Sequence, residues 1–207
     1  MYARTTTIQA QPSSVDAGIV HLRDEVMPAL LAVEGCVGLS LMADRHSGRC
    51  MATTAWESEE AMRAGGASVE SIRRDAARAF GGTVDTVEQW EIAVLHRDHR
   101  TGEGACARCT WLQGDPGAID RAIDAFRAGV LPQIESMDGF CSASLFVDRA
   151  TGRAVAVTAW DGHDAMDSGR EHANRVRSSA SQDIDARVLE VAEFDLAVAH
   201  LRVPEMA

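Results

Sequence analysis

The strongest constraint on the fold of this chain is an internal duplication. Shifting the 207-residue sequence against itself aligns residues 3–96 with residues 107–200 without a gap. Roughly three in ten of the aligned pairs are identical, far more than two unrelated segments would share. The longest shared block aligns 40–49 with 144–153, and a Thr-Ala-Trp tripeptide follows it in both copies. The chain is therefore expected to fold as two homologous units.

The boundaries of the two units follow from the stretch between the aligned copies. Residues 98–104 are charged and contain glycine, which suits an exposed linker. We therefore expect one domain over residues 1–97 and a second over residues 105–207. Hydrophobic residues make up 46% of the chain and charged residues 25%, so each domain can bury a core.

Each copy contains the same pattern of apolar periodicity. Apolar residues spaced three and four apart predict a first helix that Pro28 and Pro132 should kink. Two β-rich runs joined by a glycine-containing turn follow, and then a more polar helix over 58–80 and 162–184, weakened in the first copy by Gly65 and Gly66. With an opening and a closing strand, each half has the order βαββαβ.

This order predicts an α+β protein made of two tandem ferredoxin-like domains, each with both helices on one face of an antiparallel sheet. Several strands are apolar on both sides, so the second face should also be covered, and the homologous sheet in the same chain is the expected cover. The chain would then be an intramolecular pseudo-dimer. Strict alternation along the closing strand predicts that Trp90, Ile92, Val94 and His96 share one face.

Composition excludes several functions. The net charge is -11, which disfavours nucleic acids and anionic membranes as partners. All 20 basic residues are arginine, so Schiff-base lysines and lysine phosphate loops are excluded. We find no signal peptide and no membrane span in the sequence, and we expect a cytoplasmic protein. Five cysteines at irregular spacing indicate reduced thiols, and Cys106 and Cys109 should point to opposite faces of a strand.

The motif D-R-x-[ST]-G-R followed by T-A-W-[ED]-x-x-x-A-M resembles the antibiotic biosynthesis monooxygenase (ABM) family, here as a tandem fusion covering nearly the whole chain. The resemblance implies two sheets that close into a dimeric α+β barrel, with a pocket between sheet and helices in each half. Members of the wider superfamily include cofactor-free oxygenases of polyketides and haem-degrading enzymes. The positions that match the haem-degrading pattern hold residues of the wrong type here.

Oxygenation without a cofactor requires a base to deprotonate the substrate and a cation to hold the resulting anion. We predict His172, Arg108 and Arg177 as catalytic residues, and we predict that Thr110, Trp160 and Asn174 contact the ligand. We expect the functional pocket in the second half of the chain, because the second helix of that half is richer in hydrogen-bonding groups. No cofactor and no metal site are expected from the spacing of potential ligands.

Two classes of function remain open on this scaffold. The first is a cofactor-independent monooxygenase acting on a small aromatic or polyketide-type substrate. The second is a protein without catalytic activity that binds a small aromatic or apolar ligand or serves a structural role. Haem binding is a minor alternative. Further assembly into a homo-oligomer is compatible with either class.

Overall fold

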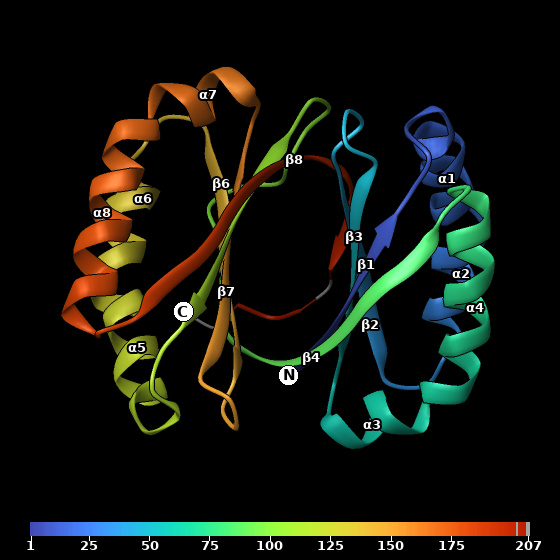
Figure 1. Ribbon diagram of the computed structural model, residues 1–207, viewed down its shortest axis with the longest axis horizontal. Helices are drawn as coiled ribbons and strands as arrows, with labels where there is room; N and C mark the ends of the chain where they lie inside the picture. Colours follow the sequence, from blue (N-terminus) through green and yellow to red (C-terminus); the bar gives the residue numbers. More distant parts are fainter. Residues whose placement is uncertain (202, 206–207) are drawn as a thin grey trace. The chain divides into compact units, whose positions relative to one another are not determined.

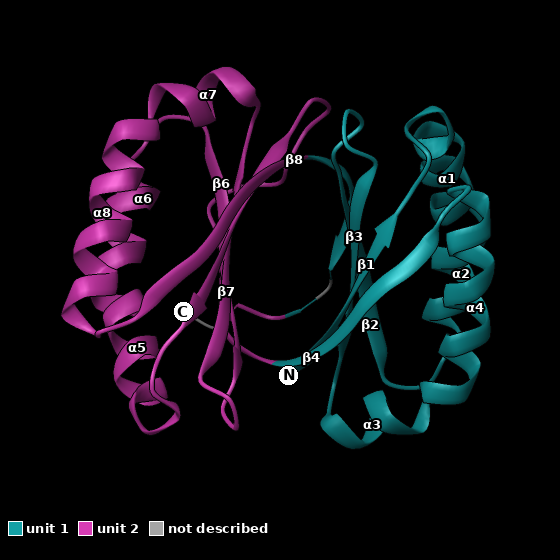
Figure 2. Cartoon of the chain, in the orientation of Figure 1, with its two compact units in different colours: residues 1–90, 195–203 teal, residues 91–194, 204–207 magenta. Residues whose placement is uncertain are grey.

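The computed structural model describes residues 1–201 and 203–205, and these form two compact units. Unit 1 comprises Met1–Trp90 with Asp195–Val203, and unit 2 comprises Glu91–Phe194 with Pro204–Ala207 (Figure 2). The units differ from the sequence repeats because the long strands β4 and β8 each continue from one unit into the other. The domain boundaries predicted from the repeats stay a prediction.

Each unit contains an antiparallel sheet built from its own strands and the end of a strand from the other copy. In unit 1, β1 pairs with β3, β3 pairs with β2, and β2 pairs with residues 195–201 of β8. Unit 2 repeats this with β5, β7 and β6, and β6 pairs with residues 91–97 of β4. The strand bounds are β1 Tyr2–Gln9, β2 Cys36–Ala43, β3 Arg49–Trp56, β4 Thr83–Arg97, β5 Cys106–Gln113, β6 Phe140–Asp148, β7 Arg153–Trp160 and β8 Arg187–Leu201.

The hydrogen-bonded strand order β1-β3-β2-β8-β5-β7-β6-β4 is closed, as in an α+β barrel, and the predicted α+β class is confirmed. In each unit the helices cover one face of the sheet (Figure 1). None of the helices in the described part of the chain has the length and apolar character that crossing a membrane requires. The helix bounds are η1 Pro12–Ser14, α1 Val15–His21, η2 Leu22–Val26, α2 Met27–Leu31, α3 Glu59–Ala64, α4 Gly66–Ala79, η3 Pro116–Ala118, α5 Ile119–Ala125, η4 Phe126–Val130, α6 Leu131–Glu135, α7 His163–Ser168 and α8 Arg170–Asp183.

The first helix of each copy continues through its proline by widening one turn. In unit 1 the π-helical turn η2 precedes Pro28, and the backbone N–H of Met27 donates to the carbonyl of Leu22, five residues earlier. The same wide turn, η4, precedes Pro132 in unit 2. Because proline lacks an N–H and crowds the preceding turn, a locally wider helix accommodates it without a break.

The second helix of each copy is interrupted by a glycine, and the predicted continuous helix is corrected in both. α3 and α4 meet at Gly65, and α7 and α8 meet at Gly169. A Cβ on Gly65 would lie 2.8 Å from Cη2 of the fully buried Trp56. The glycine therefore allows the helix to pass directly over the tryptophan ring.

The closing strand does not keep one face toward the helices, so the predicted alternation is wrong. Ile92 pairs with Phe146 and Val94 pairs with Leu145, with a register shift between them. Because directly opposed residues share a face and neighbouring residues of one strand alternate, Ile92 and Val94 point to opposite sides. The bulge places Val94 in the core beneath the helices of unit 2.

Two neighbouring glycines test the contact between helix and tryptophan. Gly65→Ala should lower the free energy of unfolding by about 1 to 3 kcal/mol, because the new methyl group overlaps a buried ring. A Cβ on Gly66 would meet no heavy atom within 4 Å. Gly66→Ala should therefore raise stability by about 0.5 to 1 kcal/mol through helix propensity. Urea unfolding of both variants measures the difference, and equal stabilities would contradict this packing.

Candidate functional site

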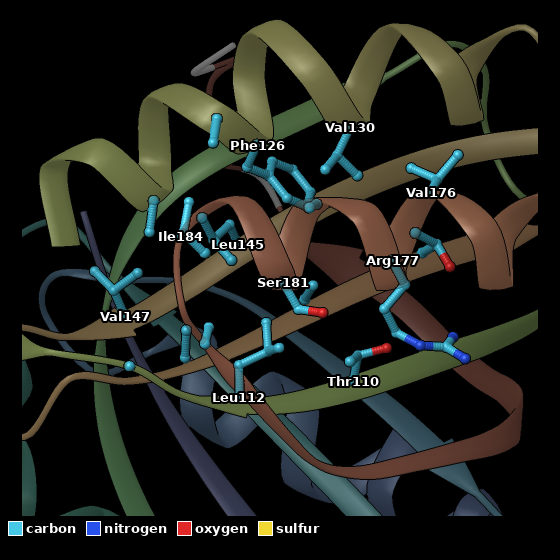
Figure 3. Close-up of a pocket in the computed structure, with 18 of the residues that line it drawn as sticks. Thr110, Leu112, Phe126, Val130, Leu145, Val147, Val176, Arg177, Ser181 and Ile184 are labelled. Atoms are coloured by element: carbon cyan, nitrogen blue, oxygen red, sulfur yellow. The ribbon is translucent and has the colours of Figure 1, made fainter. Parts of the chain in front are cut away.

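Unit 2 contains a cavity of about 120 Å³ between its sheet and its helices. Strands β5, β6 and β7 form the floor, while α5, η4 and α8 form the roof (Figure 3). The side chains of Phe126 and Val130 reach the cavity from the roof, and those of Leu112, Leu145 and Val147 line it from the floor. Most of the wall is apolar, so the cavity suits the apolar part of a small ligand.

Small side chains create the open space. α8 faces the cavity at positions spaced by three and four residues, as one stripe of a helix does. Alanine occupies many of the positions on both walls, where larger residues would meet across the gap. These are Ala122, Ala125, Ala154, Ala156, Ala173 and Ala180.

In unit 1 an aromatic ring lies at the equivalent position. Phe80 is fully buried, and a Cβ on Gly18 would lie 2.4 to 2.6 Å from its ring carbons. The aligned residues in unit 2 are Ile184 and Ala122, which both line the cavity. The two copies thus differ by a Phe/Gly pair that closes the space and an Ile/Ala pair that leaves it open.

A buried arginine stands at one end of the cavity. Arg108 on β5 is 4% exposed, and its Nε donates to Oε1 of Glu193 at 2.9 Å. Its Nη2 lies 3.4 Å from the carbonyl oxygen of Met166. Its Nη1 is buried and has no hydrogen-bond partner. A buried N–H of a charged group without an acceptor is costly, and this geometry leaves one donor available for an anion.

Glu193 connects Arg108 to a second arginine at the surface. Arg170 binds this carboxylate through both terminal nitrogens, at 2.7 and 2.9 Å. Burial acts to raise the pKa of Glu193, but the hydrogen bonds from Arg170 and Arg108 outweigh it and lower that pKa overall. The carboxylate is therefore ionised and holds Arg108 in place.

Arg177 adds a further positive charge on the same side. It lines the cavity from α8, and its side chain extends toward the strand that carries Thr110 (Figure 3). Burial and the nearby charge of Arg108 lower the pKa of Arg177. Its Nη2 donates to the neutral amide oxygen of Asn174 at 2.7 Å. This end of the cavity therefore combines two neighbouring guanidinium groups, one of which hydrogen-bonds a neutral side chain.

The arginine arrangement has a partial counterpart in unit 1. Arg4 aligns with Arg108, donates to the carbonyl oxygen of Met62 at 2.9 Å and also has an unpartnered Nη1. Its guanidinium carbon lies 6.0 Å from the centre of the Trp56 ring. A buried arginine is thus common to both copies, whereas the cavity described above lies in unit 2.

The structure places four of the six predicted site residues at the cavity. Arg108, Thr110, Trp160 and Arg177 line it. The indole N–H of Trp160 donates to the hydroxyl of Thr158 at 3.1 Å, so this group is already satisfied. The roles assigned to these residues stay predictions.

The other two predicted residues lie on α8 but outside the cavity lining. Asn174 is exposed and accepts a hydrogen bond from Arg177, so it contacts a lining residue without lining the cavity itself. His172 is half-buried. Among the described residues that line the cavity there is no His, Cys or Tyr, and the one carboxylate is Asp115. The cavity itself therefore offers no set of metal ligands.

The sequence reasoning missed Glu193 and Arg170, although the duplication contains a signal for them. In the first copy the aligned positions hold Gln89 and Gly66. Both members of an ion pair are therefore present in one copy and absent from the other. A search for positions where the second copy gains both an acidic and a basic residue would have indicated the ion pair between Glu193 and Arg170.

The fold defines a class of proteins with solved structures. The chain superposes on an anthrone oxidase-like protein with a TM-score of 0.63 and 17% identity, covering 97% of this chain and 95% of that one. It also superposes on an uncharacterized ferredoxin-fold protein of Listeria monocytogenes related to antibiotic biosynthesis monooxygenases, with a TM-score of 0.52, 7% identity and 95% of each chain covered. A heme-degrading enzyme of the same organism gives 0.52 at 6% identity, covering 94% of this chain and 99% of that one. The predicted resemblance to the ABM fold is confirmed.

Sequence comparison identifies the family within that class. The chain is 52% identical to the uncharacterized protein Rv2557 of Mycobacterium tuberculosis over 206 residues, covering 100% of this chain and 92% of the relative. It is 56% identical to the uncharacterized protein Rv2558 of the same organism over 207 residues, covering 100% and 87%. No protein-family model matches the chain. The chain belongs to the family of Rv2557 and Rv2558.

The Glu193 ion pair should make stability depend on pH. The pKa of Glu193 is lower in the folded protein than in the unfolded chain, so its contribution is present above the unfolded pKa and is lost as pH falls through the folded pKa. Glu193→Gln should lower the free energy of unfolding by about 2 kcal/mol at neutral pH, because Arg108 loses its ionic partner. It should also flatten the acid limb of the stability curve.

Urea unfolding between neutral and acidic pH measures both effects. Asp75→Asn is a suitable control, since it removes the carboxylate of an exposed pair with Arg78. Exposed pairs contribute about 0 to 1 kcal/mol, so this control should stay close to the parent protein. Parallel curves for Glu193→Gln and the parent protein would refute the role assigned to Glu193.

Proposed function

We propose that unit 2 binds a small apolar molecule carrying a carboxylate or a similar planar oxyanion. The apolar part occupies the cavity, and the oxyanion accepts hydrogen bonds from Arg108 and Arg177. The observation that carries the proposal is the unpartnered Nη1 of Arg108, a donor on a side chain that is 4% exposed and lines a mostly apolar cavity. A bound oxyanion supplies the acceptor that this donor lacks.

The balance of charge supports an anionic ligand. Glu193 is shared between Arg108 and Arg170, and Arg170 also binds Asp167. The hydrogen-bond acceptor of Arg177 is the neutral Asn174. A ligand carboxylate beside Arg177 and Arg108 would offset the repulsion between the two guanidinium groups. Planar carboxylates also match the fork of N–H donors that a guanidinium presents.

The size and lining of the cavity support a small ligand. Its volume of about 120 Å³ is near that of an engineered apolar cavity that binds benzene, roughly 150 Å³. Thr110 and Thr158 lie beside the cationic end, while Leu112 and Ile184 lie farther along the apolar wall. A single aromatic ring or a short alkyl chain with an acidic group fits this arrangement.

The lining residues favour binding over oxygenation. An oxygenase without a cofactor needs a proton acceptor beside the substrate. Among the described residues of the lining, the one carboxylate belongs to Asp115, which follows the end of β5 away from Arg108 and accepts the N–H of Gly117 at 2.8 Å. The cationic end can therefore stabilise a ligand that is already an anion, but its described lining residues offer no group that would deprotonate a neutral one. Oxygen consumption with an anthrone or quinol substrate would support the oxygenase alternative instead.

Two probes of the same shape but different charge test the oxyanion site. The protein should bind para-ethylbenzoate more tightly than para-ethylbenzamide in calorimetric titrations. Arg177→Met should weaken the benzoate by about 10- to 100-fold, because a charge-assisted hydrogen bond is lost, and should change the benzamide little. Arg73→Met replaces the aligned arginine of unit 1 and serves as the matched control, with no effect expected. Equal binding of both probes by the parent protein would overturn the oxyanion site.

Closing the cavity tests the apolar site separately. The double variant Ala122→Gly with Ile184→Phe gives unit 2 the same pair as unit 1, where the ring of Phe80 packs against Gly18. We expect it to fold with a stability close to that of the parent and to lose binding of both probes. Ile184→Leu conserves volume and should retain binding. If the closed variant still binds the benzoate, the ligand site lies elsewhere.

A further inference from the structure

Unit 2 contains a second cluster of reactive side chains that is separate from the cavity. His99 follows β4, Cys141 lies near the start of β6, and Asp161 follows the last residue of β7. Each offers one potential ligand atom, and the three atoms all lie within 4.8 Å of one another. We propose that His99, Cys141 and Asp161 bind a zinc ion, with one coordination position left to water.

The distances between the ligand atoms suit tetrahedral zinc. Nε2 of His99 lies 3.0 Å from Oδ1 of Asp161, and Sγ of Cys141 lies 3.4 Å from the same oxygen. Bonds of roughly 2.0 to 2.3 Å at tetrahedral angles place neighbouring ligand atoms roughly 3.3 to 3.8 Å apart. Small side-chain rotations would therefore bring all three atoms around one ion. A histidine nitrogen, a thiolate and a carboxylate are all ligands that zinc accepts.

A fourth residue orients the histidine. Oδ2 of Asp98 lies 2.7 Å from Nδ1 of His99, so Nδ1 is occupied and Nε2 faces Asp161 and Cys141. A carboxylate that binds the second nitrogen of a ligating histidine is a recurring feature of zinc sites, because it fixes the ring and raises its basicity. Asp98 would thus position His99 without binding the metal.

The backbone holds the three segments together without help from an ion. The amides of Asp98 and His99 both donate to the carbonyl oxygen of Cys141, at 2.9 and 3.3 Å. The amide of Asp161 donates to the carbonyl oxygen of Gly139 at 2.8 Å. The site is therefore assembled before a metal arrives, which lowers the conformational cost of binding.

The site is accessible from solvent on one side. The side chains of His99 and Asp161 are 41% and 54% exposed, whereas Cys141 is fully buried beneath them. An ion can therefore enter between the two exposed groups and reach the thiol. Binding replaces the S–H bond of Cys141 with a sulfur–zinc bond, and the proton passes to water. Water then completes the coordination.

The set of ligands is specific to the second copy. Cys141 aligns with Val37 and Asp161 aligns with Glu57, so the first copy lacks the thiol. The ligands come from three segments far apart in the sequence, and no short motif connects them. The expectation of no metal site rested on spacing, which contains no information about this tertiary cluster.

Cobalt substitution tests the site on the 207-residue chain without an affinity tag. Cobalt(II) should bind with one-to-one stoichiometry and give an intense thiolate charge-transfer absorption in the near ultraviolet, which zinc should then abolish by displacement. Cys141→Ser should remove this band. Cys36→Ser changes another buried thiol, one that belongs to no cluster of three potential metal ligands among the described residues, and should retain the band. Melting curves of the metal-free variants confirm that each one folds.

Two further variants separate a zinc site from a cluster of hydrogen bonds. His99→Ala changes an exposed side chain and should abolish binding, while Asp98→Asn should weaken zinc by about 10- to 100-fold through loss of histidine positioning. Zinc should also raise the melting temperature of the parent protein and not that of Cys141→Ser. A cobalt spectrum without the charge-transfer band, or zinc affinity unchanged in Cys141→Ser, would overturn the proposal. Neither result depends on the ligand of the cavity.

Discussion

The structure depends on the pairing that extends each sheet with the end of a strand from the other copy. Residues 91–97 of β4 pair with β6, and residues 195–201 of β8 pair with β2. A bulge in each long strand accompanies this exchange and changes which side chains face the helices. The core of unit 2 therefore includes Val94, and the core of unit 1 includes Val198, so each hydrophobic core contains a residue from the other copy.

Within this shared frame the two copies have diverged in how they fill the space between sheet and helices. In unit 1 the space contains the ring of Phe80, and the strand residues Ile8 and Cys50 are fully buried. The aligned residues Leu112 and Ala154 are half-buried at the cavity of unit 2. A duplicated fold allows this division because one copy can keep a closely packed core while the other keeps an open space.

The sequence was sufficient to predict the architecture because its signals are local. Helical periodicity and turn glycines depend on neighbouring residues, the repeat is visible when the sequence is aligned with itself, and the structure agrees on the order of elements. The sequence indicated that Gly65 weakens the second helix but not that the helix breaks there, and the bulge after Ile92 was missed, because both depend on tertiary contacts. Gly65 faces Trp56 across the interior, and the register of Ile92 is set by pairing with Phe146, which no local pattern reveals.

The residues of the candidate sites likewise separate into those that the sequence indicated and those that it did not. Arg108 and Thr110 could be assigned to one face because residues two apart on a strand point to the same side, and Arg177 stood out because an arginine recurs at this position in both copies. The Glu193 ion pair joins residues on separate elements, and the His99 cluster joins three segments that no spacing rule connects. The open volume also depends on many alanines acting together. Such properties emerge only when the elements pack.

The exchange of strand ends has a consequence for the order in which the protein is made. During synthesis β1, β2 and β3 leave the ribosome long before residues 195–201, which complete the sheet of unit 1. The backbone amides and carbonyls along the outer edge of β2 have no ladder partner during that interval. The nascent first copy is therefore incomplete until residues 195–201 emerge, and termination of translation before them leaves an aggregation-prone edge exposed even when the first repeat is intact.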